Sequence, residues 1–337
     1  MSEASHPEQP GHAGRMNSVF FDSPMDEERR RERLYEGQIF VFSPRPSTRA
    51  LCELAREMTE AAFRPLDPRD AQHALPVEEY VAILAALKPR FIHHPEAKDL
   101  IRQILAEFGC DLADTYFDVP RLRSATHGGY LTSGIAYAFH PHRDTWYSAP
   151  FSQLNWWLPV YDITPENALA FHPRYWDRPL RNGSHRYNYA EWNRGSRQNA
   201  AKHIKQDTRE QPRPEEPVEL DPQIRVVCPV GGLILFSAAQ LHSTVPNTSG
   251  RTRFSVDFRT VSRGDLLEGA GAPNIDSACT GTTVGDYLRA TDLAHLPGEL
   301  IDRCEREPAA ARRHGAGRLR RLHPGVTPIG PKGEWLP

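Results

Sequence analysis

A histidine and an aspartate stand two residues apart at His142 and Asp144, within the triplet His-Arg-Asp. Residues two apart point to the same side of an extended chain, so this imidazole and this carboxylate can approach one metal ion together. A neutral imidazole combined with a carboxylate suits a divalent iron. His140 lies two residues earlier and is a reserve candidate, either as a partner that orients a ligand or as an alternative ligand. The spacing alone is weak evidence, since a chain with 15 histidines contains roughly one such pair by chance.

A second histidine, His242, strengthens the metal hypothesis. It follows the apolar segment Leu233–Ser237, which predicts a buried strand. The next predicted strand, Arg253–Val261, alternates over 253–259 so that one face there carries Arg253, Ser255, Asp257 and Arg259, all polar. This polar face has two interpretations: it is the solvated side of a sheet, or Arg253 and Ser255 bind a dicarboxylate through a salt link and a hydrogen bond.

The elements that must position these side chains change in character along the chain. Amphipathic periodicity and capping residues predict early helices at 47–63, 77–87 and 95–108. Short apolar stretches separated by turn residues follow, up to about residue 262. The predicted strands are Tyr35–Ser43, Ser133–Phe139, Gln153–Val160, Arg225–Val227, Leu233–Ser237 and Arg253–Val261. Helices that precede a β core indicate an α+β protein built around a β-sandwich or barrel.

Three segments are expected. Residues 1–30 form a disordered leader that ends in a charged helix start, and residues 31–262 form the main domain with its N-terminal helices. Within it, the charged stretch 202–222 is an exposed excursion. Residues 263–337 form an extension that packs on the same domain, with short helices at 285–290 and 297–305 and a basic run at 312–321. That run is typical of a solvated tail, with a polyanion-binding arm as the alternative.

Composition excludes several classes of protein. The 41 basic residues against 43 acidic ones leave a charge of −2, which argues against a nucleic-acid-binding protein. No apolar run approaches the ~18 residues that a membrane-spanning helix needs. The five cysteines contain no CxxC pair, which disfavours a disulfide scaffold or a zinc knuckle. The start of the chain has no signal-peptide character, so a cytoplasmic location is expected.

The order of these residues resembles a known family. His142-x-Asp144, then His242, then Arg253 eleven residues later with Ser255 beside it, resembles the iron(II)/2-oxoglutarate oxygenases. The segment 242–253 is most similar to the phytanoyl-CoA dioxygenase-like branch, as are the segments 37–42 and 166–169. The resemblance covers roughly residues 35–262 and implies a double-stranded β-helix, a jelly-roll or cupin-like core. It departs from the family at 170–186, where an insertion splits a turn that is usually continuous.

The resemblance also implies the cofactors and their ligands. His142, Asp144 and His242 would bind Fe(II) on one face of an octahedron, which leaves three positions for 2-oxoglutarate and O2. Arg253 and Ser255 would hold the remote carboxylate of 2-oxoglutarate, with Gln153 and Asn155 as further cofactor-binding candidates. Decarboxylation of 2-oxoglutarate to succinate and CO2 would accompany oxidation of a substrate C–H bond. Because residue 144 is Asp, no position is left for a halide, so hydroxylation is favoured over halogenation, with desaturation and ring formation left open.

Aromatic residues suggest the substrate wall. Five of the six tryptophans lie between residues 146 and 192, although aromatic rings more often pack in a core. The candidate substrate contacts are Arg143, Trp146, Trp157 and Arg181. We expect a small polar natural-product intermediate as substrate, no nucleic-acid or membrane partner, and a monomer or homodimer.

Two other functions compete with the oxygenase. A cupin-like metal protein can use the same ligands as an isomerase or hydrolase, or as a small-molecule binding module, because a fold does not determine function. A β-sandwich binding or scaffold module is the other alternative, and in it the polar strand face would merely be solvated. Arg253 and Ser255 separate the first alternative from the oxygenase, since a metal hydrolase has no use for a buried dicarboxylate site.

Overall fold

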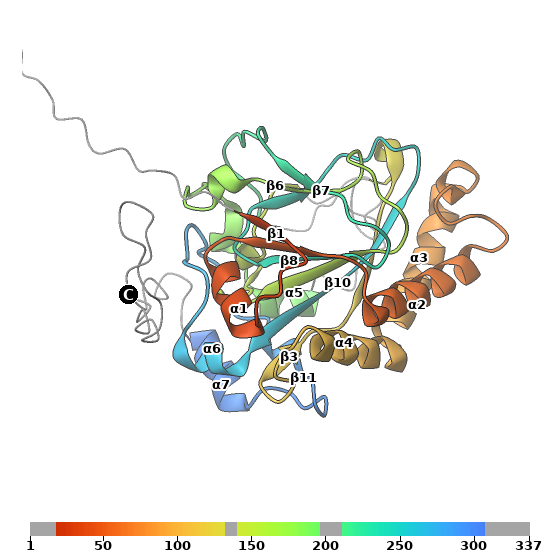
Figure 1. Ribbon diagram of the computed structural model, residues 1–337. Coiled ribbons are helices and arrows are strands. Elements are labelled where there is room, and N and C mark those ends of the chain that lie inside the picture. Colours follow the sequence, from red (N-terminus) through yellow and green to blue (C-terminus); the bar gives the residue numbers. More distant parts are fainter. Residues whose placement is uncertain (1–17, 132–139, 196–210, 307–337) are drawn as a thin grey trace, which may run out of the picture.

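The computed structural model describes residues 18–131, 140–195 and 211–306 (Figure 1). Three helices gather on one side of a large sheet: α2 (Pro46–Phe63), α3 (Val77–Ile92) and α4 (Pro95–Glu107). These match the predicted early helices, although α3 continues through Pro89 to Ile92. The α+β class is therefore confirmed. No helix in the described part of the chain is long and apolar enough to cross a membrane.

The large sheet has the strand order β1-β2-β8-β5-β10-β3-β11, and β4 also pairs with β10. All neighbours are antiparallel except β1 and β2. Its strands are β1 (Val19–Phe21), β2 (Ile39–Phe42), β3 (Thr115–Phe117), β4 (Arg121–Ala125), β5 (Leu154–Pro159), β8 (Leu233–Ser237), β10 (Arg253–Ser262) and β11 (Leu288–Arg289).

A second, smaller sheet has the order β7-β6-β9. It consists of β6 (Leu169–Phe171), β7 (Ile224–Val226) and β9 (His242–Thr244). Figure 1 shows β6 and β7 above the layer of β1, β8 and β10. The strand pairing defines two sheets, and the double-stranded β-helix remains a prediction.

Alternation along the strands gives the large sheet two buried faces. On one face, Phe40, Leu235, Trp156 and Phe258 join the core formed with helices α2, α3 and α4. On the other face, Val41, Trp157, Ile234 and Phe236 join a core shared with Leu169 and Phe171 of the small sheet. Since successive strand residues point to opposite faces, the same strands serve both cores. The space between the two sheets holds the site described below.

Three predictions about element boundaries were wrong. The expected strand Tyr35–Ser43 begins later, because Tyr35 ends helix α1 (Glu27–Tyr35) and Gly37 adopts a positive φ of 94° before β2. The leader expected to be disordered at 1–30 contains β1, which pairs with β2, whereas the start of α1 at its end agrees with the expected charged helix start. The expected helix at 285–290 is a short 3-10 turn, Val284–Asp286, followed by β11 at the sheet edge.

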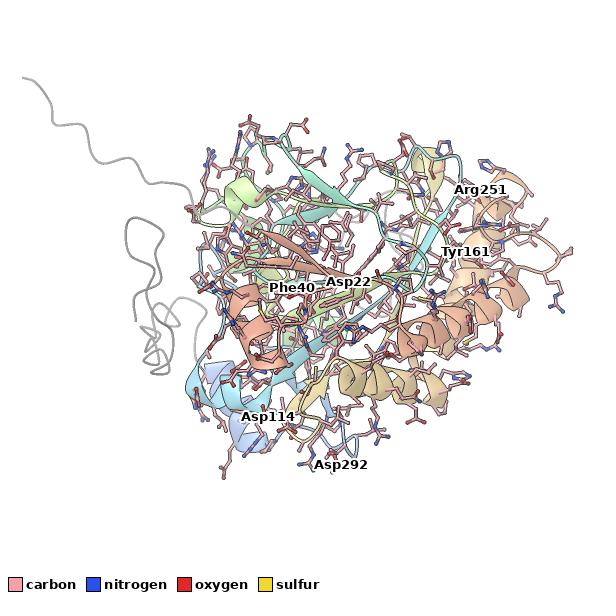
Figure 2. The ribbon with its side chains drawn as sticks, in the orientation of Figure 1. Asp22, Phe40, Asp114, Tyr161, Arg251 and Asp292 are labelled. Carbon is pink, nitrogen blue, oxygen red and sulfur yellow. The ribbon has the colours of Figure 1, made fainter. Side chains whose placement is uncertain are left out.

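The extension after residue 262 packs on the large sheet through α6 (Arg263–Glu268), β11 and α7 (Gly298–Arg306). Asp114, labelled in Figure 2, accepts hydrogen bonds from the Ser262 hydroxyl and the Gly264 amide at 2.5 and 3.0 Å, which ties the end of β10 to the start of α6. Four predicted segments lie wholly or largely outside the described residues: most of the leader, the strand Ser133–Phe139, the first half of the excursion at 202–222 and the basic run at 312–321.

Candidate metal centre

The structure brings His142, Asp144 and His242 together, with one potential ligand atom from each within 4.8 Å of the others. A backbone bridge sets the two histidines opposite each other, since the amide of each donates to the carbonyl of the other at 3.0 Å. Their ring centroids lie 4.3 Å apart. His242 begins β9, and Asp144 begins a 3-10 turn, Asp144–Tyr147. Pairing between residues 100 apart in the chain therefore assembles the predicted triad.

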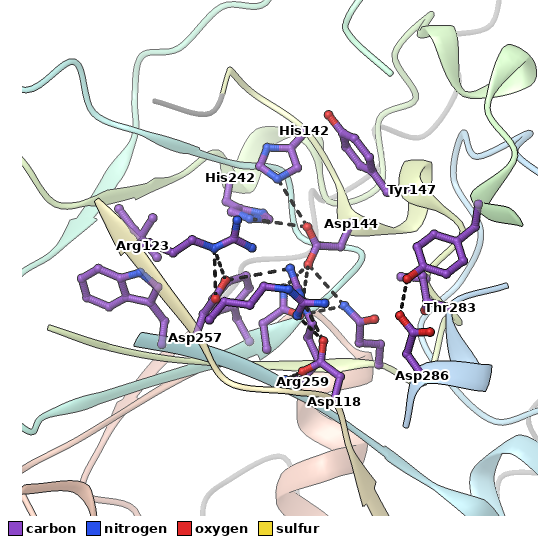
Figure 3. Close-up of a pocket in the computed structure, with 18 of the residues that line it drawn as sticks. Asp118, Arg123, His142, Asp144, Tyr147, His242, Asp257, Arg259, Thr283 and Asp286 are labelled. Atoms are coloured by element: carbon purple, nitrogen blue, oxygen red, sulfur yellow. Dashed lines mark hydrogen bonds and ion pairs between the residues drawn. The ribbon is translucent and has the colours of Figure 1, made fainter. Parts of the chain in front are cut away.

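Backbone carbonyls determine which nitrogen of each imidazole faces the centre. Nδ1 of His142 lies 2.8 Å from the carbonyl of His140, and Nδ1 of His242 lies 3.0 Å from that of Gln240. A carbonyl only accepts, so Nδ1 carries a proton, and in the neutral imidazole Nε2 then presents its lone pair to the centre. The two Nε2 atoms lie 3.3 and 4.0 Å from Asp144 Oδ1 (Figure 3). This is the arrangement that a ligating histidine needs.

Two amides hold the other oxygen of Asp144. Asn155 Nδ2 and Gln153 Nε2 donate to Oδ2 at 2.9 and 3.2 Å. Oδ1 is thereby left to face the histidines. Gln153 and Asn155 line the same cavity, as expected for cofactor-binding candidates, but their amides contact the carboxylate ligand.

The electrostatics of the site favour a neutral His242 and an ionised Asp144. Burial and the nearby charge of His142 together lower the pKa of His242 to about 4, against the opposing effects of Asp144 and the Gln240 carbonyl. Burial alone would raise the pKa of Asp144, but contact with His142, the charges of both histidines and the Asn155 hydrogen bond lower it to about 2. Two imidazole nitrogens and an ionised carboxylate are a donor set suited to a divalent first-row metal, so the residues fit iron(II).

The triad opens into a cavity of about 330 Å³. Arg253 lines it but is only 5 % exposed, and its Nε has no hydrogen-bond partner among the described residues. Its other contacts are with uncharged groups. One terminal nitrogen donates to the Asn167 carbonyl at 3.0 Å, and the guanidinium lies 5.4 Å from the Trp157 ring centroid. Burial lowers the pKa of Arg253 to about 10. A buried cation with an unused donor is costly unless an anion binds there.

Ser255 is fully buried behind Arg253, and its hydroxyl also has no partner in the described chain. It does not line the cavity itself. Burial of these two residues overturns the interpretation of the polar face of β10 as a solvated surface.

A charged wall that the sequence analysis did not single out borders the cavity. Antiparallel pairing sets Arg121 of β4 opposite Asp257, and Arg123 opposite Ser255. Arg123 Nε contacts both Asp257 oxygens at 3.1 and 3.2 Å, and Arg259 contacts Asp118 at 3.1 Å (Figure 3). The alternation Arg121-Leu122-Arg123 was a signal for it, but only the strand pairing shows where those arginines point.

Aromatic residues form the opposite wall. Tyr147, Tyr187 and Trp192 follow one another, with ring centroids 5.4 and 5.9 Å apart, and Tyr147 also lies 5.7 Å from the His142 ring. Tyr189 of helix α5 (Tyr189–Gly195) and Trp157 complete the aromatic lining. Trp157 therefore lines the cavity, and its contact with a substrate stays a prediction.

The other three predicted substrate contacts do not line the cavity. Arg143 is 1 % exposed and binds Asp276 and the Ala239 carbonyl, while the Trp146 indole donates to Asp276 at 2.7 Å. Both serve to join the metal-binding turn to the segment around Asp276. Arg181 has a side chain 74 % exposed and reaches Glu216 at 3.4 Å. These predictions were wrong because proximity in the sequence to a metal ligand does not determine whether a side chain points into the cavity or away from it.

Tyr287 is a cavity residue that no sequence signal indicated. It belongs to the C-terminal extension, and its hydroxyl donates to Gln153 Oε1 at 2.7 Å. His140, the reserve candidate, is held through its ring by the Pro212 carbonyl at 2.8 Å and contributes its own carbonyl to His142.

No protein-family model and no curated protein matches the chain. Among solved structures, it is similar to EvdO2 from Micromonospora carbonacea var. aurantiaca, with 16 % identity and a TM-score of 0.41 over 71 % of this chain and 91 % of that one. The apo non-heme monooxygenase ThoJ gives 16 % identity and a TM-score of 0.38 over 68 % and 76 %. The alpha-ketoglutarate-dependent epimerase SnoN from nogalamycin biosynthesis gives 13 % and 0.34 over 70 % and 84 %. Similarity of this extent says little about chemistry, so the function has to be read from the residues of the site.

Proposed function

We propose that this chain is an iron(II)/2-oxoglutarate-dependent oxygenase that oxidises a C–H bond of a small molecule. One observation carries the proposal: a His-Asp-His donor set, with both Nε2 atoms and one carboxylate oxygen converging, opens into a cavity that also contains a buried arginine with an unused donor. The donor set binds the metal and leaves open positions. The arginine binds a carboxylate.

Each group of residues has a separate task. His142, Asp144 and His242 would hold iron(II), and Arg253 with Ser255 would hold the remote carboxylate of 2-oxoglutarate. When bound, iron(II) and 2-oxoglutarate supply the oxidising chemistry, in which O2 is consumed, 2-oxoglutarate becomes succinate and CO2, and a C–H bond is oxidised. The protein itself binds, orients and excludes water. We propose hydroxylation as the outcome, since Asp144 fills the position that a halide would need.

The charges of the cavity indicate the type of substrate. Four arginines line it together with four aspartates: Arg121, Arg123, Arg253, Arg259, Asp118, Asp144, Asp257 and Asp286. A dication and a dianionic co-substrate add no net charge. The cavity therefore favours a polar substrate without net charge, and the aromatic wall offers flat surfaces for its apolar faces. We propose a small polar natural-product intermediate.

Anaerobic binding of Fe(II) and 2-oxoglutarate tests the proposal. The wild-type protein should develop a weak metal-to-ligand charge-transfer band in the visible, which requires the keto acid to chelate iron. His142→Ala and His242→Ala should abolish the band. Arg253→Ala should keep it but require more 2-oxoglutarate. Arg251→Ala is the matched control, since Arg251 is two residues away and pairs with Asp70 at the surface.

Two results would contradict the proposal. Iron binding without the band at saturating 2-oxoglutarate would favour the cupin-like isomerase or hydrolase. A band of unchanged 2-oxoglutarate dependence in Arg253→Ala would remove the arginine from the site while keeping the metal centre.

A further inference from the structure

We infer that Tyr287, a residue of the C-terminal extension, is a positioning residue for the metal centre: through Gln153 it determines which oxygen of Asp144 faces the two histidines. This inference rests on the proposed function, because it assigns Tyr287 a role toward the metal. It also gives the extension a part in the site, beyond packing on the sheet.

A continuous chain of hydrogen bonds connects Tyr287 to the ligand. The Tyr287 hydroxyl donates to Gln153 Oε1 at 2.7 Å, and Gln153 Nε2 donates to Asp144 Oδ2 at 3.2 Å. Gln153 Nε2 also donates to Asn155 Oδ1 at 2.9 Å, and Asn155 Nδ2 donates to the same Asp144 oxygen at 2.9 Å. The three residues of this chain, Tyr287, Gln153 and Asn155, are all buried, with Tyr287 1 % exposed.

Chemistry allows only one direction for this chain. The Asp144 carboxylate has acceptors only, so each amide must turn its NH2 group toward it. The carbonyl of Gln153 then faces Tyr287, whose hydroxyl must donate. Without that donor, the buried Gln153 carbonyl would lose this hydrogen bond, which costs free energy in a buried site. Rotating the amide would let its NH2 group donate to the Tyr287 oxygen, but it would set a carbonyl against the Asp144 carboxylate and lose the donations to Asp144 and Asn155. Tyr287 thus favours the one orientation in which Gln153 binds Oδ2 and leaves Oδ1 for the metal.

The fold holds Tyr287 in place from several sides. Its amide closes the 3-10 turn by donating to the Val284 carbonyl at 3.2 Å, and the next two residues pair with β3. Its ring packs among Tyr116, Val261 and Leu300 in the core between the extension and the sheet. Figure 3 shows the neighbouring Thr283 and Asp286 beside the cavity, on the far side of Asp144 from Arg123. A hydroxyl held from several sides can fix the position of Gln153 and, through Gln153, that of the Asp144 carboxylate.

Binding of Co(II) alone, measured by calorimetry and by its visible d–d absorption, tests the inference. Partners that orient metal ligands typically account for 10- to 100-fold in metal affinity, so Gln153→Leu should weaken Co(II) binding about 10-fold and Tyr287→Phe about 3- to 10-fold. Both variants should also change the shape of the Co(II) absorption. Tyr80→Phe is the matched control: Tyr80 is fully buried, its hydroxyl bonds Thr252 at 3.2 Å, and it does not line the cavity. It should leave Co(II) affinity and absorption unchanged.

A double-mutant cycle separates positioning from general loosening of the fold. If Tyr287 acts through Gln153, then Tyr287→Phe should cause no further loss of Co(II) affinity in the Gln153→Leu protein. Additive losses, or a Tyr287→Phe protein with wild-type Co(II) affinity and absorption, would overturn the inference. Failure of the wild-type protein to bind Co(II) would instead overturn the proposed function. The cycle compares the Co(II) affinities of folded molecules. A lower free energy of unfolding in Tyr287→Phe, of the kind that Tyr80→Phe would also show, therefore does not produce the expected loss of affinity.

Discussion

The two faces of strand β10 carry opposite kinds of residue, although neither face is exposed to solvent. Toward helices α2, α3 and α4, it presents Phe254, Val256 and Phe258, all completely buried. Toward the small sheet, it presents Arg253, Ser255, Asp257 and Arg259, which belong to the cavity or lie directly behind it. Burying the first set stabilises the fold, whereas burying guanidinium and carboxylate groups costs free energy unless they are paired. One strand therefore joins a stabilising face to a costly one, and such a cost is typical of a site built to bind something.

The largest expected effect is on the helix-facing side. Phe258→Ala removes a buried ring that stacks on Trp156 with centroids 5.4 Å apart, and it should lower the free energy of unfolding by about 3–5 kcal/mol. Urea denaturation of the metal-free protein measures this. The remaining folded molecules should bind Co(II) with wild-type affinity. A loss below about 1 kcal/mol would mean that the face is not a stabilising core.

Arg253→Ala tests the opposite side of the same strand. Removing one member of a buried charge pair typically costs 2–5 kcal/mol, so 2-oxoglutarate should bind at least about 30-fold more weakly to the iron-loaded protein. The free energy of unfolding should not fall, because the unliganded protein loses a buried cation that is incompletely paired. Anaerobic titration and urea denaturation give the two values. If Arg253→Ala lowered the free energy of unfolding but left the 2-oxoglutarate affinity unchanged, Arg253 would stabilise the fold and would not bind 2-oxoglutarate.

Acid should destabilise the cavity side of the metal-free protein. The pKa of His242 falls from 6.5 to about 4 on folding, so the neutral form is favoured, and its stabilising contribution is complete above pH 6.5 and is lost as pH falls toward 4. The pKa of Asp144 falls from 3.8 to about 2, so its contribution is lost between pH 4 and 2. Urea midpoints should therefore decrease between pH 7 and 4. His242→Gln should flatten that slope, and an equal slope in this variant would assign it to other groups.

The smallest expected effect is at a residue on neither face. Arg181→Ala removes an exposed guanidinium whose ion pair with Glu216 is screened by solvent, so unfolding free energy should change by less than about 0.5 kcal/mol. Affinities for Co(II) and 2-oxoglutarate should be unchanged. A clear loss of substrate turnover in this variant would restore Arg181 as the substrate contact that its sequence position suggested.

Much of the secondary structure was predictable because its signals are local. The periodicity of residues 47–63 and the proline at 95 indicated α2 and α4, and the apolar run Leu233–Ser237 indicated β8 with both ends correct. The start of β2 was misjudged because the strand was extended back to the aromatic Tyr35, which completes the last turn of α1, while Gly37 separates the helix from the strand. The edge strand β11 was missed since two residues carry no periodicity, and only pairing with β3 makes them a strand.

For the site, the sequence by itself determined the ligand types, their order and the polar face of β10, because two-residue alternation is a local property of an extended chain. Only the tertiary structure decided which of these residues meet. The bridge between His142 and His242, the charged wall of β4 against β10, and the contact of Tyr287 with Gln153 each join segments far apart in the chain. Such contacts depend on strand register and on packing between sheets, which no short stretch of sequence contains. For the same reason, Arg143 is a structural anchor although it stands between two ligands.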